Sequence, residues 1–326
     1  MINKIKDCAS NLGFDLVKII KAEKSCAARN RLKKWLKQGF NADMNWMRNR
    51  AGIASNPQKI LPNAKSVICL ATNYFTKIPP HLHKDNARIA RYAWCRNYHK
   101  IIEKRLKLLA QFIKQIAPNA AVKHYVDTGP FLERHFAAQS DLGIIGKNTC
   151  LITQEFGSYV FLAEIITDLE LKPDKPIKLI FSCGTCTRCI DSCPTKAIIA
   201  PYTIDARKCL SYLTIESRGK IPKNLRAKIP PWLFGCDICQ EVCPHNTRAK
   251  STTNPEFHLA PIFEKLTLKN LRAIKTEKQF TKIFSGTSLL RAKFKGIINN
   301  VQIINPKNNA RKLRRFRNSS KRPRER

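Results

Sequence analysis

The chain has 326 residues, of which 43% are hydrophobic, and carries a formal charge of +37 from 60 Lys and Arg against 23 Asp and Glu. This length is enough for two or three domains with buried cores. No stretch approaches the roughly 18–20 uncharged apolar residues of a membrane span, and the N-terminus has no secretory signal pattern. We therefore exclude an integral membrane or exported protein and expect a cytoplasmic one.

The excess of basic residues predicts a polyanionic partner, with nucleic acid as the first candidate. The last 22 residues contribute +9 of the charge, so most of it lies in the rest of the chain. A Lys-rich composition with a simply solvated surface would give the same excess. An acidic membrane surface is less favoured, because no strongly basic amphipathic helix is evident.

Residues 1–170 alternate helical and strand patterns. Segments 64–75 and 121–128 are rich in β-branched and aromatic residues and predict strands. Apolar residues at helical spacing predict a long helix over 88–116 that ends before Pro118. Segments 149–153 and 157–167, separated by a short turn at Gly157, predict a hairpin. This half is expected to be an α/β or α+β domain.

The middle of the chain begins with a proline-containing linker, 171–178, and continues into a cysteine-rich second domain, 183–243. Beyond it, segments 263–274 and 277–284 predict short amphipathic helices. The basic tail is too polar to bury a core, and we expect it to be disordered when unbound.

Four cysteines, Cys183, Cys186, Cys189 and Cys193, are followed by Pro194 and form a C-x2-C-x2-C-x3-C-P run. This spacing is typical of a cubane iron-sulfur cluster, in which three thiolates bind one cluster and the fourth binds its neighbour. A structural zinc site would instead favour two C-x2-C pairs separated by a long stretch. We therefore predict clusters.

A second set of cysteines completes two sites of four. By the crossed pairing of two-cluster ferredoxins, the first cluster would be held by Cys183, Cys186, Cys189 and Cys243, and the second by Cys193, Cys209, Cys236 and Cys239. The remaining five are scattered without ligand spacing, and we interpret them as small buried apolar residues: Cys8, Cys26, Cys69, Cys95 and Cys150.

Two adjacent clusters transfer electrons one at a time and imply a redox centre that receives them. The large N-terminal domain must then bind a cofactor or a substrate. It has no G-x-G-x-x-G fingerprint and no Walker A loop, because the segment 143–149 lacks the upstream glycine and the Ser or Thr directly after Lys147. Nicotinamide and nucleotide triphosphate chemistry are thus disfavoured.

Six segments occur in a characteristic order: VDTGPFLER, LGIIGKNTCLIT, GSYVFLAEIIT, CGTCTRCIDSCPTKAI, CLSYLTIESRG and FGCDICQEVCPHN. With both cysteine runs, this ordered set resembles the epoxyqueuosine reductases, cobalamin-dependent enzymes of tRNA queuosine synthesis. The similarity spans about residues 64–246, with a fainter echo in FSGTSLLRAKFKGIINN.

The resemblance implies an α+β protein in three parts. An N-terminal α/β cobalamin-binding catalytic domain would span 1–170, a ferredoxin-like domain with two [4Fe-4S] clusters 171–250, and a short helical HEAT-like remnant with the basic tail 251–326. It implies reduction of epoxyqueuosine to queuosine in the tRNA anticodon, the final step of queuosine biosynthesis, by cob(I)alamin formed from cob(II)alamin without an axial histidine. We also expect an external low-potential electron donor and a monomer.

Asp127 matches the proton donor of the family. A donor must be protonated near neutral pH, and we expect an apolar corrin face and the substrate to raise the pKa of Asp127 by desolvation. From the residues alone, Asp127 or Thr128 before Pro130 is equally typical of a helix N-cap.

Other roles also follow from the resemblance. Cofactor contacts are expected, besides Asp127, from Ile152, Ala163, Thr167, Ser211, Cys236 and Asp237. The tRNA is expected to contact Arg218, Lys220, Lys223 and Arg226, with a solvated loop as the alternative. An arginine that the family often has near Ala54 is missing, and Arg48 or Arg50 is a candidate replacement.

Three rival functions remain open. A reductive dehalogenase-like cobalamin enzyme would share both kinds of cofactor but act on a small molecule. A non-catalytic electron-transfer module and an iron-sulfur protein that only binds nucleic acid are the others.

Overall fold

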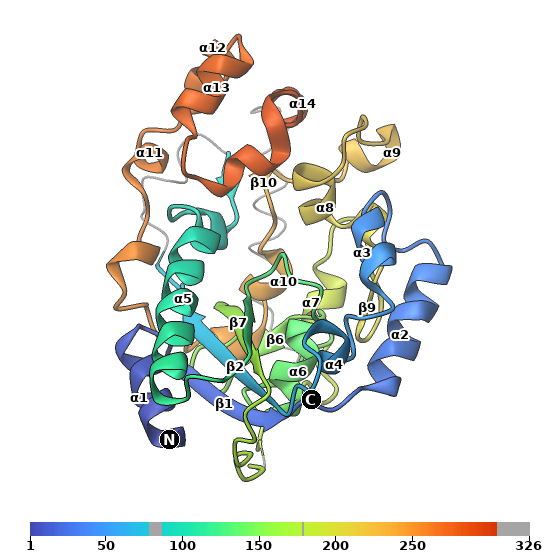
Figure 1. Ribbon diagram of the computed structural model, residues 1–326. Helices are drawn as coiled ribbons and strands as arrows, with labels where there is room; N and C mark the ends of the chain where they lie inside the picture. Colours follow the sequence, from blue (N-terminus) through green and yellow to red (C-terminus); the bar gives the residue numbers. More distant parts are fainter. Residues whose placement is uncertain (78–86, 178, 305–326) are drawn as a thin grey trace.

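The computed structural model describes residues 1–77, 87–177 and 179–304 (Figure 1). At its centre is a four-stranded sheet in the order β1 (Leu16–Lys21), β2 (Ser66–Asn73), β7 (Val160–Thr167) and β4 (Val122–Tyr125). All three pairings in this sheet are antiparallel. The mixed helix and strand composition is as expected, and the antiparallel pairing makes the N-terminal part α+β rather than parallel α/β.

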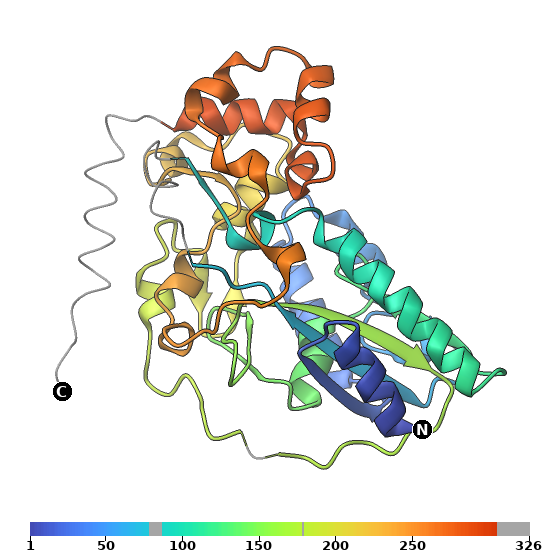
Figure 2. The same ribbon diagram turned by 90° about the vertical axis from the view of Figure 1, so that its left-hand side faces the viewer.

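Both faces of the sheet are covered, because side chains alternate between faces along each strand. Ile68 and Leu70 of β2 pack with α1 (Ile2–Asn11) and α5 (Tyr98–Ile116) in one core. Figure 2 shows these two helices side by side on this face. Val67 and Cys69 pack on the other face against α4 (Pro57–Ile60) and α6 (Glu133–Gln139).

The helix predicted over 88–116 is shorter than expected. Residues 88–97 form β3 (Arg88–Ile89) and a 3-10 turn, and α5 starts only at Tyr98. The Asn97 side chain caps α5 by accepting the backbone N–H of His99. Arg88 and Ile89 are extended because β3 pairs with β10 (Trp232–Phe234), a distant strand that local periodicity cannot reveal.

The predicted hairpin is also wrong in its pairing. β6 (Leu151–Ile152) pairs with β5 (Ile144–Ile145), whereas β7 lies between β2 and β4 in the large sheet. Between the two predicted segments, the described residues form a single isolated bridge, which joins Thr153 and Gly157. Tertiary pairing with β2 outcompetes the local turn, because most of β7 is buried on both faces.

The cysteine-rich region is built from short elements. These are α7 (Arg188–Asp191), β8 (Ile198–Ala200), β9 (Thr203–Ile204), α8 (Leu210–Ile215), α9 (Lys223–Arg226), β10 and α10 (Ile238–Glu241). The N-terminal helices α2 (Cys26–Lys37) and α3 (Asn45–Arg50) lie beside this region (Figure 1). Trp35 Nε1 donates to Ile204 O at 2.7 Å, and the Tyr212 hydroxyl donates to Asp43 Oδ2 at 2.6 Å. The region is therefore fixed to the N-terminal part.

Short helices form the end of the described chain and lie together in both views (Figures 1 and 2). They are α11 (Pro261–Glu264), α12 (Leu268–Ala273), α13 (Glu277–Ile283), the 3-10 helix η6 (Ser288–Ala292) and α14 (Lys293–Ile303). Their apolar faces share a core with Leu233 and Phe234 of β10. The basic tail, 305–326, lies outside the described residues. Among the described helices, none combines the length and apolarity that crossing a bilayer requires.

Candidate active site

Asp127 lies two residues after the end of β4 and has a left-handed backbone, with φ of 57°. Its carboxylate Oδ2 accepts a hydrogen bond from the Tyr98 hydroxyl at 2.9 Å and lies 2.9 Å from His99 Nε2. The Asp127 side chain is 57% exposed, whereas Tyr98 is buried and stacks on Phe161 of β7 at 4.2 Å. The first turn of α5 thus presents two polar groups to an accessible carboxylate.

The orientation of His99 is fixed from both sides. His99 Nδ1 lies 2.9 Å from Asn97 Oδ1, and this oxygen also accepts the backbone N–H of His99. Asn97 therefore faces the ring with its carbonyl oxygen. Since the other ring nitrogen faces a carboxylate, both nitrogens are satisfied as donors only in the protonated imidazolium.

The pKa of Asp127 is lowered, contrary to our expectation from the sequence. Desolvation raises this pKa, but the hydrogen bond and charge of His99, the hydrogen bond from Tyr98 and the charge of Arg134 lower it by more. The carboxyl is thus held as the anion by its protein neighbours. The N-cap interpretation is also wrong, because α6 begins at Glu133 with Leu132 as its uncapped N-cap residue.

The loop after Asp127 is held by an arginine. Arg50 Nη1 donates to Thr128 O at 2.5 Å and lies 3.4 Å from Gly129 O. Arg48, the other candidate, donates to Leu36 O at 3.2 Å on α2 instead. Of the two arginines, Arg50 is therefore the one that reaches the Asp127 loop.

The eight cysteines of the two runs fall into two electrostatic groups. The pKa of Cys189 is raised to about 11 by burial and then by the charges of Cys243, Cys183 and Cys186. Burial also raises the pKa of Cys236, with further contributions from Cys209 and Cys193. The hydrogen bond with Cys150 and burial raise the pKa of Cys239, and the charges of Cys150, Cys236 and Cys209 add to this. Cys193 thus interacts with Cys209 and Cys236, as the crossed ligand assignment requires.

Backbone N–H groups already point at two of these sulfurs. Lys147 N lies 3.4 Å from Cys183 Sγ, and Ala197 N lies 3.2 Å from Cys193 Sγ. Such N–H···S hydrogen bonds tune iron-sulfur clusters. In 1–77, 87–177 and 179–304, no three His, Cys, Asp or Glu side chains come close enough to hold a single metal ion. The donor set and its N–H groups fit [4Fe-4S] clusters.

Three of the five remaining cysteines differ from our interpretation as buried apolar residues. Cys26 is exposed at the start of α2, Cys8 is half-buried on α1, and Cys150 is half-buried with its thiol hydrogen-bonded to Cys239. Cys69 and Cys95 are buried as expected. The contact of Cys150 depends on packing between distant segments, so its sequence spacing gives no sign of it.

The predicted cofactor contacts differ in accessibility. Ser211 of α8 and Cys236 are half-buried, so part of each residue is accessible to a ligand. Ile152, Ala163 and Asp237 are 1–3% exposed, and Thr167 is completely buried. Thr167 pairs with Val122 at the opposite end of β4 from Asp127. A ligand at Asp127 can touch the Thr167 side chain only if the sheet packing changes.

Aromatic rings connect Asp127 with the cysteine-rich region. Tyr98 lies edge-on to Tyr92 with ring centroids 6.0 Å apart, and Tyr92 lies 6.1 Å from Phe234, two residues before Cys236. The charges of Asp127 and Asp237 both act on Tyr92 and, after burial, raise its pKa. Tyr92 is therefore close enough to both Asp127 and Asp237, one from each half of the predicted site, to be affected by the charge of each.

The four predicted tRNA contacts are not equivalent. Arg218 donates to Ile215 O at 3.1 Å and to Arg291 O at 3.0 Å, and so joins α8 to η6. Arg226 Nε donates to Ile221 O at 2.6 Å. Lys220 and Lys223 are exposed. The exposed ammonium groups of the two lysines can contact a polyanion, whereas Arg218 and Arg226 already donate hydrogen bonds to backbone carbonyls of the chain.

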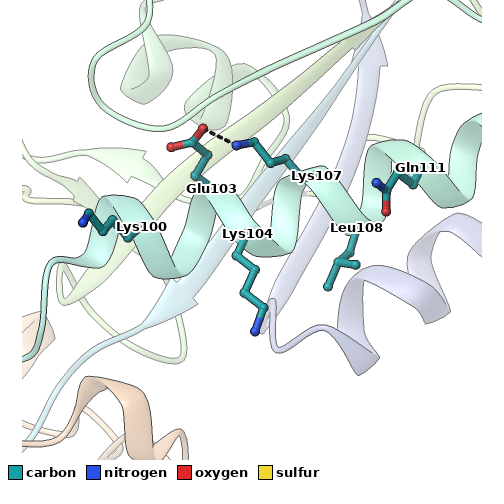
Figure 3. A pocket seen from close by; sticks show the side chains of 6 residues that line it. All are labelled: Lys100, Glu103, Lys104, Lys107, Leu108 and Gln111. Carbon is teal, nitrogen blue, oxygen red and sulfur yellow. Dashed lines mark ion pairs between the residues drawn. The ribbon is translucent and has the colours of Figure 1, made fainter.

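A surface hollow follows the outer side of α5 and is separate from this site. Figure 3 shows its lining residues, all from α5, with Lys107 paired to Glu103 at 2.9 Å. Lys104 and Leu108 of this stripe extend from the same side of the helix. The hollow contains none of the predicted site residues.

Sequence reasoning missed Tyr98, His99, Glu133 and Glu164, which surround Asp127. Glu133 Oε1 accepts the backbone N–H of Asp127, and burial and then the charges of Glu133 and Asp127 raise the pKa of Glu164. Two signals were available: the RNYH sequence at the start of a long helix, and a single glutamate within the otherwise apolar strand VFLAEII. Neither identifies its partner, because the hydrogen bonds to Asp127 join residues up to 29 positions apart.

Two protein-family models match the chain. One, "4Fe-4S double cluster binding domain", covers residues 182–246, and the other, "Epoxyqueuosine reductase QueG, DUF1730", covers residues 55–128. The epoxyqueuosine reductase of Cellulophaga algicola is 40% identical over 301 residues, which are 92% of this chain and 96% of that protein. The Synechocystis enzyme of the same name is 41% identical over 78% of this chain and 88% of its own length.

Solved structures agree. An epoxyqueuosine reductase crystallised with an epoxyqueuosine-modified tRNA-Tyr stem loop matches with a TM-score of 0.83 at 30% identity, over 98% of this chain and 82% of that one. An epoxyqueuosine reductase from Bacillus subtilis, with its catalytic aspartate loop swung out of the active site, matches with a TM-score of 0.82 at 29% identity over the same shares.

Proposed function

Since the chain belongs to the epoxyqueuosine reductase family, as its 40% identity over 92% of its length shows, we propose that Asp127 is the proton donor of that reaction here. The chain is an oxidoreductase of queuosine biosynthesis that reduces epoxyqueuosine to queuosine. The observation that supports the role of Asp127 is its accessible carboxylate, which faces His99 at 2.9 Å.

The lowered pKa of Asp127 is compatible with proton donation if His99 holds the proton. The imidazolium, fixed by Asn97, passes its Nε2 proton to Asp127 Oδ2, which delivers it to the departing epoxide oxygen. Desolvation by a bound substrate favours this transfer, because it raises the pKa of a carboxyl group. The overall reaction takes two electrons and two protons, releases water and leaves an alkene in the cyclopentene ring.

The cysteine groups would hold two [4Fe-4S] clusters in the crossed arrangement. Cys183, Cys186, Cys189 and Cys243 would bind one cluster and Cys193, Cys209, Cys236 and Cys239 the other, supported by the two electrostatic groups of thiols. The match of residues 182–246 to a double-cluster domain supports the same count. An external low-potential donor would supply the electrons.

Cobalamin is the proposed second cofactor, held without an axial histidine. Reduced cobalamin supplies a cobalt nucleophile that can open a strained epoxide. Asp127, Ser211 and Cys236 fit this proposal because each is at least partly accessible, and Tyr92 lies between their two segments. The buried layer behind these accessible residues would include Ile152, Ala163 and Asp237. Thr167 would contribute only to the packing of the sheet.

The tRNA partner is proposed to be the anticodon stem-loop of queuosine-family tRNAs, as the stem-loop structure of the relative suggests. Lys220 and Lys223 would contact phosphates, which position the stem without reading its sequence. Arg218 and Arg226 would support the same loop. We propose a cytoplasmic monomer for this role.

The test is mass spectrometry of nucleosides from epoxyqueuosine-containing tRNA after incubation with anaerobically reconstituted protein, cobalamin and a low-potential reductant. Queuosine should form, and Asp127→Asn should keep the cluster absorption while turnover falls at least 100-fold. Full activity of Asp127→Asn would exclude the catalytic role. A small halogenated substrate in the same assay distinguishes the dehalogenase alternative.

A further inference from the structure

Lys147 belongs to a segment, 143–149, that contains a glycine and a lysine but lacks the Walker A pattern. In the structure this lysine lies in the turn between β5 and β6. Gly146 N donates to Cys150 O at 2.9 Å, and Thr149 N donates to Gly146 O at 2.8 Å, which closes the turn. The role of Lys147 therefore follows from what its own polar atoms contact.

The backbone and the side chain of Lys147 both face the cysteine-rich region. Its backbone N–H points at Cys183 Sγ at 3.4 Å, and its carbonyl oxygen accepts the N–H of Tyr202, between β8 and β9, at 3.0 Å. Its side-chain Nζ donates to Gly184 O at 2.6 Å and to Cys186 O at 3.0 Å. One residue of the N-terminal part thus makes four contacts with this region.

The two carbonyls bound by Nζ lie in the loop 183–189, which would supply three ligands of the first cluster. Cys186 N donates to Cys183 O at 2.9 Å and closes the first turn of this loop. Lys147 binds the carbonyl of Gly184, inside that turn, and the carbonyl of Cys186, at its end. The ammonium therefore restrains the backbone that carries two proposed ligands.

No carboxylate neutralises the charge of Lys147 within the described part of the chain, where its Nζ donates to the two neutral carbonyl oxygens and forms no ion pair. The residue is half-buried, so solvent and salt screen this charge only in part. A positive charge thus acts on whatever the adjacent cysteines hold.

A cation at this position favours the reduced state of a cluster. Reduction adds a negative charge to an iron-sulfur cluster, and a nearby positive charge stabilises it. Hydrogen bonds to the sulfurs act in the same direction, and Lys147 N–H already faces Cys183 Sγ. The backbone and the side chain of Lys147 would therefore both raise the reduction potential.

Cations near the second group of cysteines are neutralised or exposed. Arg91 is paired with Asp237, the residue after Cys236, and with Glu241. Lys196 donates to a backbone carbonyl, but its side chain is exposed and its charge is screened. The charge of Lys147 is therefore expected to affect the first cluster more than the second.

We propose that Lys147 is a positioning residue that holds the 183–189 loop against the N-terminal part and, through its ammonium charge, raises the reduction potential of the first [4Fe-4S] cluster. Two clusters with the same type of ligand thereby acquire different potentials. This inference rests on the proposed function, because it requires the two proposed clusters.

Lys147→Gln is the decisive variant. Glutamine keeps a side-chain donor for one carbonyl but has no charge, and the backbone N–H that faces Cys183 is unchanged. The measurement is a redox titration of the anaerobically reconstituted full-length protein, followed by electron paramagnetic resonance. The equilibrium constant for reduction of one cluster should fall about tenfold, which is 59 mV for a one-electron couple, and that of the other by less than twofold.

Two further variants separate position from charge. Lys147→Arg keeps the charge and the donors, and its potentials should equal those of the unaltered chain to within threefold in the same constant. Arg188→Gln, at an exposed arginine of the same loop, is the matched control and should shift either constant by less than twofold. Lys147→Gln in the Cys236→Ala background, which should retain only the first cluster, assigns the shift to that cluster.

Iron analysis covers the case in which Lys147→Gln does not retain the first cluster. Loss of about half of the iron from Lys147→Gln, with both clusters retained by Lys147→Arg, would support the holding role. Loss of the cluster from both variants would contradict it.

Three results would overturn the inference: unshifted potentials in Lys147→Gln, equal shifts of both clusters, or an equally large shift in Arg188→Gln. An unaltered chain that holds its clusters but does not convert epoxyqueuosine would instead contradict the proposed function alone. The redox titration still decides the role of Lys147 in that case, because it requires neither tRNA nor turnover. A chain that binds no iron would contradict both.

Discussion

His99 Nε2 lies 2.9 Å from Asp127 Oδ2, while the opposite nitrogen of the same ring faces Asn97 Oδ1. A ring nitrogen of His99 and a carboxylate oxygen therefore meet at the end of β4, on an Asp127 side chain that is 57% exposed. In the proposed mechanism the donated proton comes from His99, so Asp127 itself need not be protonated in the free protein.

The Tyr98 hydroxyl stabilises this carboxylate. Removing it in Tyr98→Phe should raise the pKa of Asp127 towards its ordinary value, while the ring keeps its stacking on Phe161. A lowered pKa means that the ionised pair with His99 is present above the ordinary pKa and is lost as the pH falls through the folded value. The pH at which the Asp127 carboxyl titrates should thus move upward, by up to about one unit given the exposure of Asp127.

Tyr202→Phe, at an exposed tyrosine, is the control and should leave the profile unchanged. The measurement is the chemical shift of the Asp127 carboxyl carbon between about pH 2 and 6, a range that brackets the ordinary carboxyl pKa. Titration at the same pH in Tyr98→Phe and in the unaltered chain would show that Tyr98 does not tune Asp127.

The crossed assignment predicts that neighbouring cysteines serve different clusters. Cys189→Ala should remove the same cluster as Cys243→Ala, whereas Cys193→Ala should resemble Cys236→Ala, although Cys189 and Cys193 are four residues apart. Each variant should retain about half of the iron. Iron analysis and electron paramagnetic resonance of the reduced proteins distinguish the two groups.

Cys150→Ser provides the matched control, because Cys150 contacts Cys239 but is not a proposed ligand. It should retain both clusters. Identical spectra of Cys189→Ala and Cys193→Ala would contradict the crossed arrangement.

Arg50 is predicted to hold the loop that carries Asp127. Arg50→Ala removes the donor to Thr128 O and Gly129 O, and kcat should fall about 10- to 100-fold because small displacements of a proton donor are costly. Cluster absorption should be unchanged. Arg48→Ala, which removes a contact to α2 instead, should cost less than threefold in kcat, and equal losses in the two variants would argue against a specific role of Arg50.

Lys220 and Lys223 are predicted to bind tRNA phosphates. The double change to alanine should weaken tRNA binding and reduce the slope of log K against log salt by up to about two. Thermal stability should not change, since both side chains are exposed. A titration of labelled tRNA at several salt concentrations measures this, and an unaltered slope would place the tRNA elsewhere.

Arg218→Ala tests whether a basic residue of the same loop stabilises the fold in addition to binding tRNA. Arg218 donates to carbonyls of both α8 and η6, so its removal should destabilise the chain by about 1 kcal/mol in addition to any effect on tRNA. A denaturant titration detects this loss. Together the two variants distinguish a phosphate contact from a structural contact.

The amino-acid sequence determined the chemistry of the cysteines. Thiolates at fixed short spacing are brought together by local backbone geometry, so the C-x2-C-x2-C-x3-C-P run predicts a cluster without knowledge of the fold. The strands β2 and β4 and the end of α5 at Ala117 were predictable for the same reason: apolar periodicity and a following proline are local signals.

Only the tertiary structure decided what surrounds Asp127. Tyr98 and His99 reach it because α5 and β4 pack side by side, and Glu164 reaches Glu133 because β7 and α6 lie against each other. The start of α5 and the pairing of β6 and β7 were wrong for a related reason, since distant strands competed with local turns. The charge state of a carboxyl group depends on such neighbours more than on its own identity, so the lowered pKa of Asp127 and the raised values of its glutamate neighbours could not be predicted from the sequence.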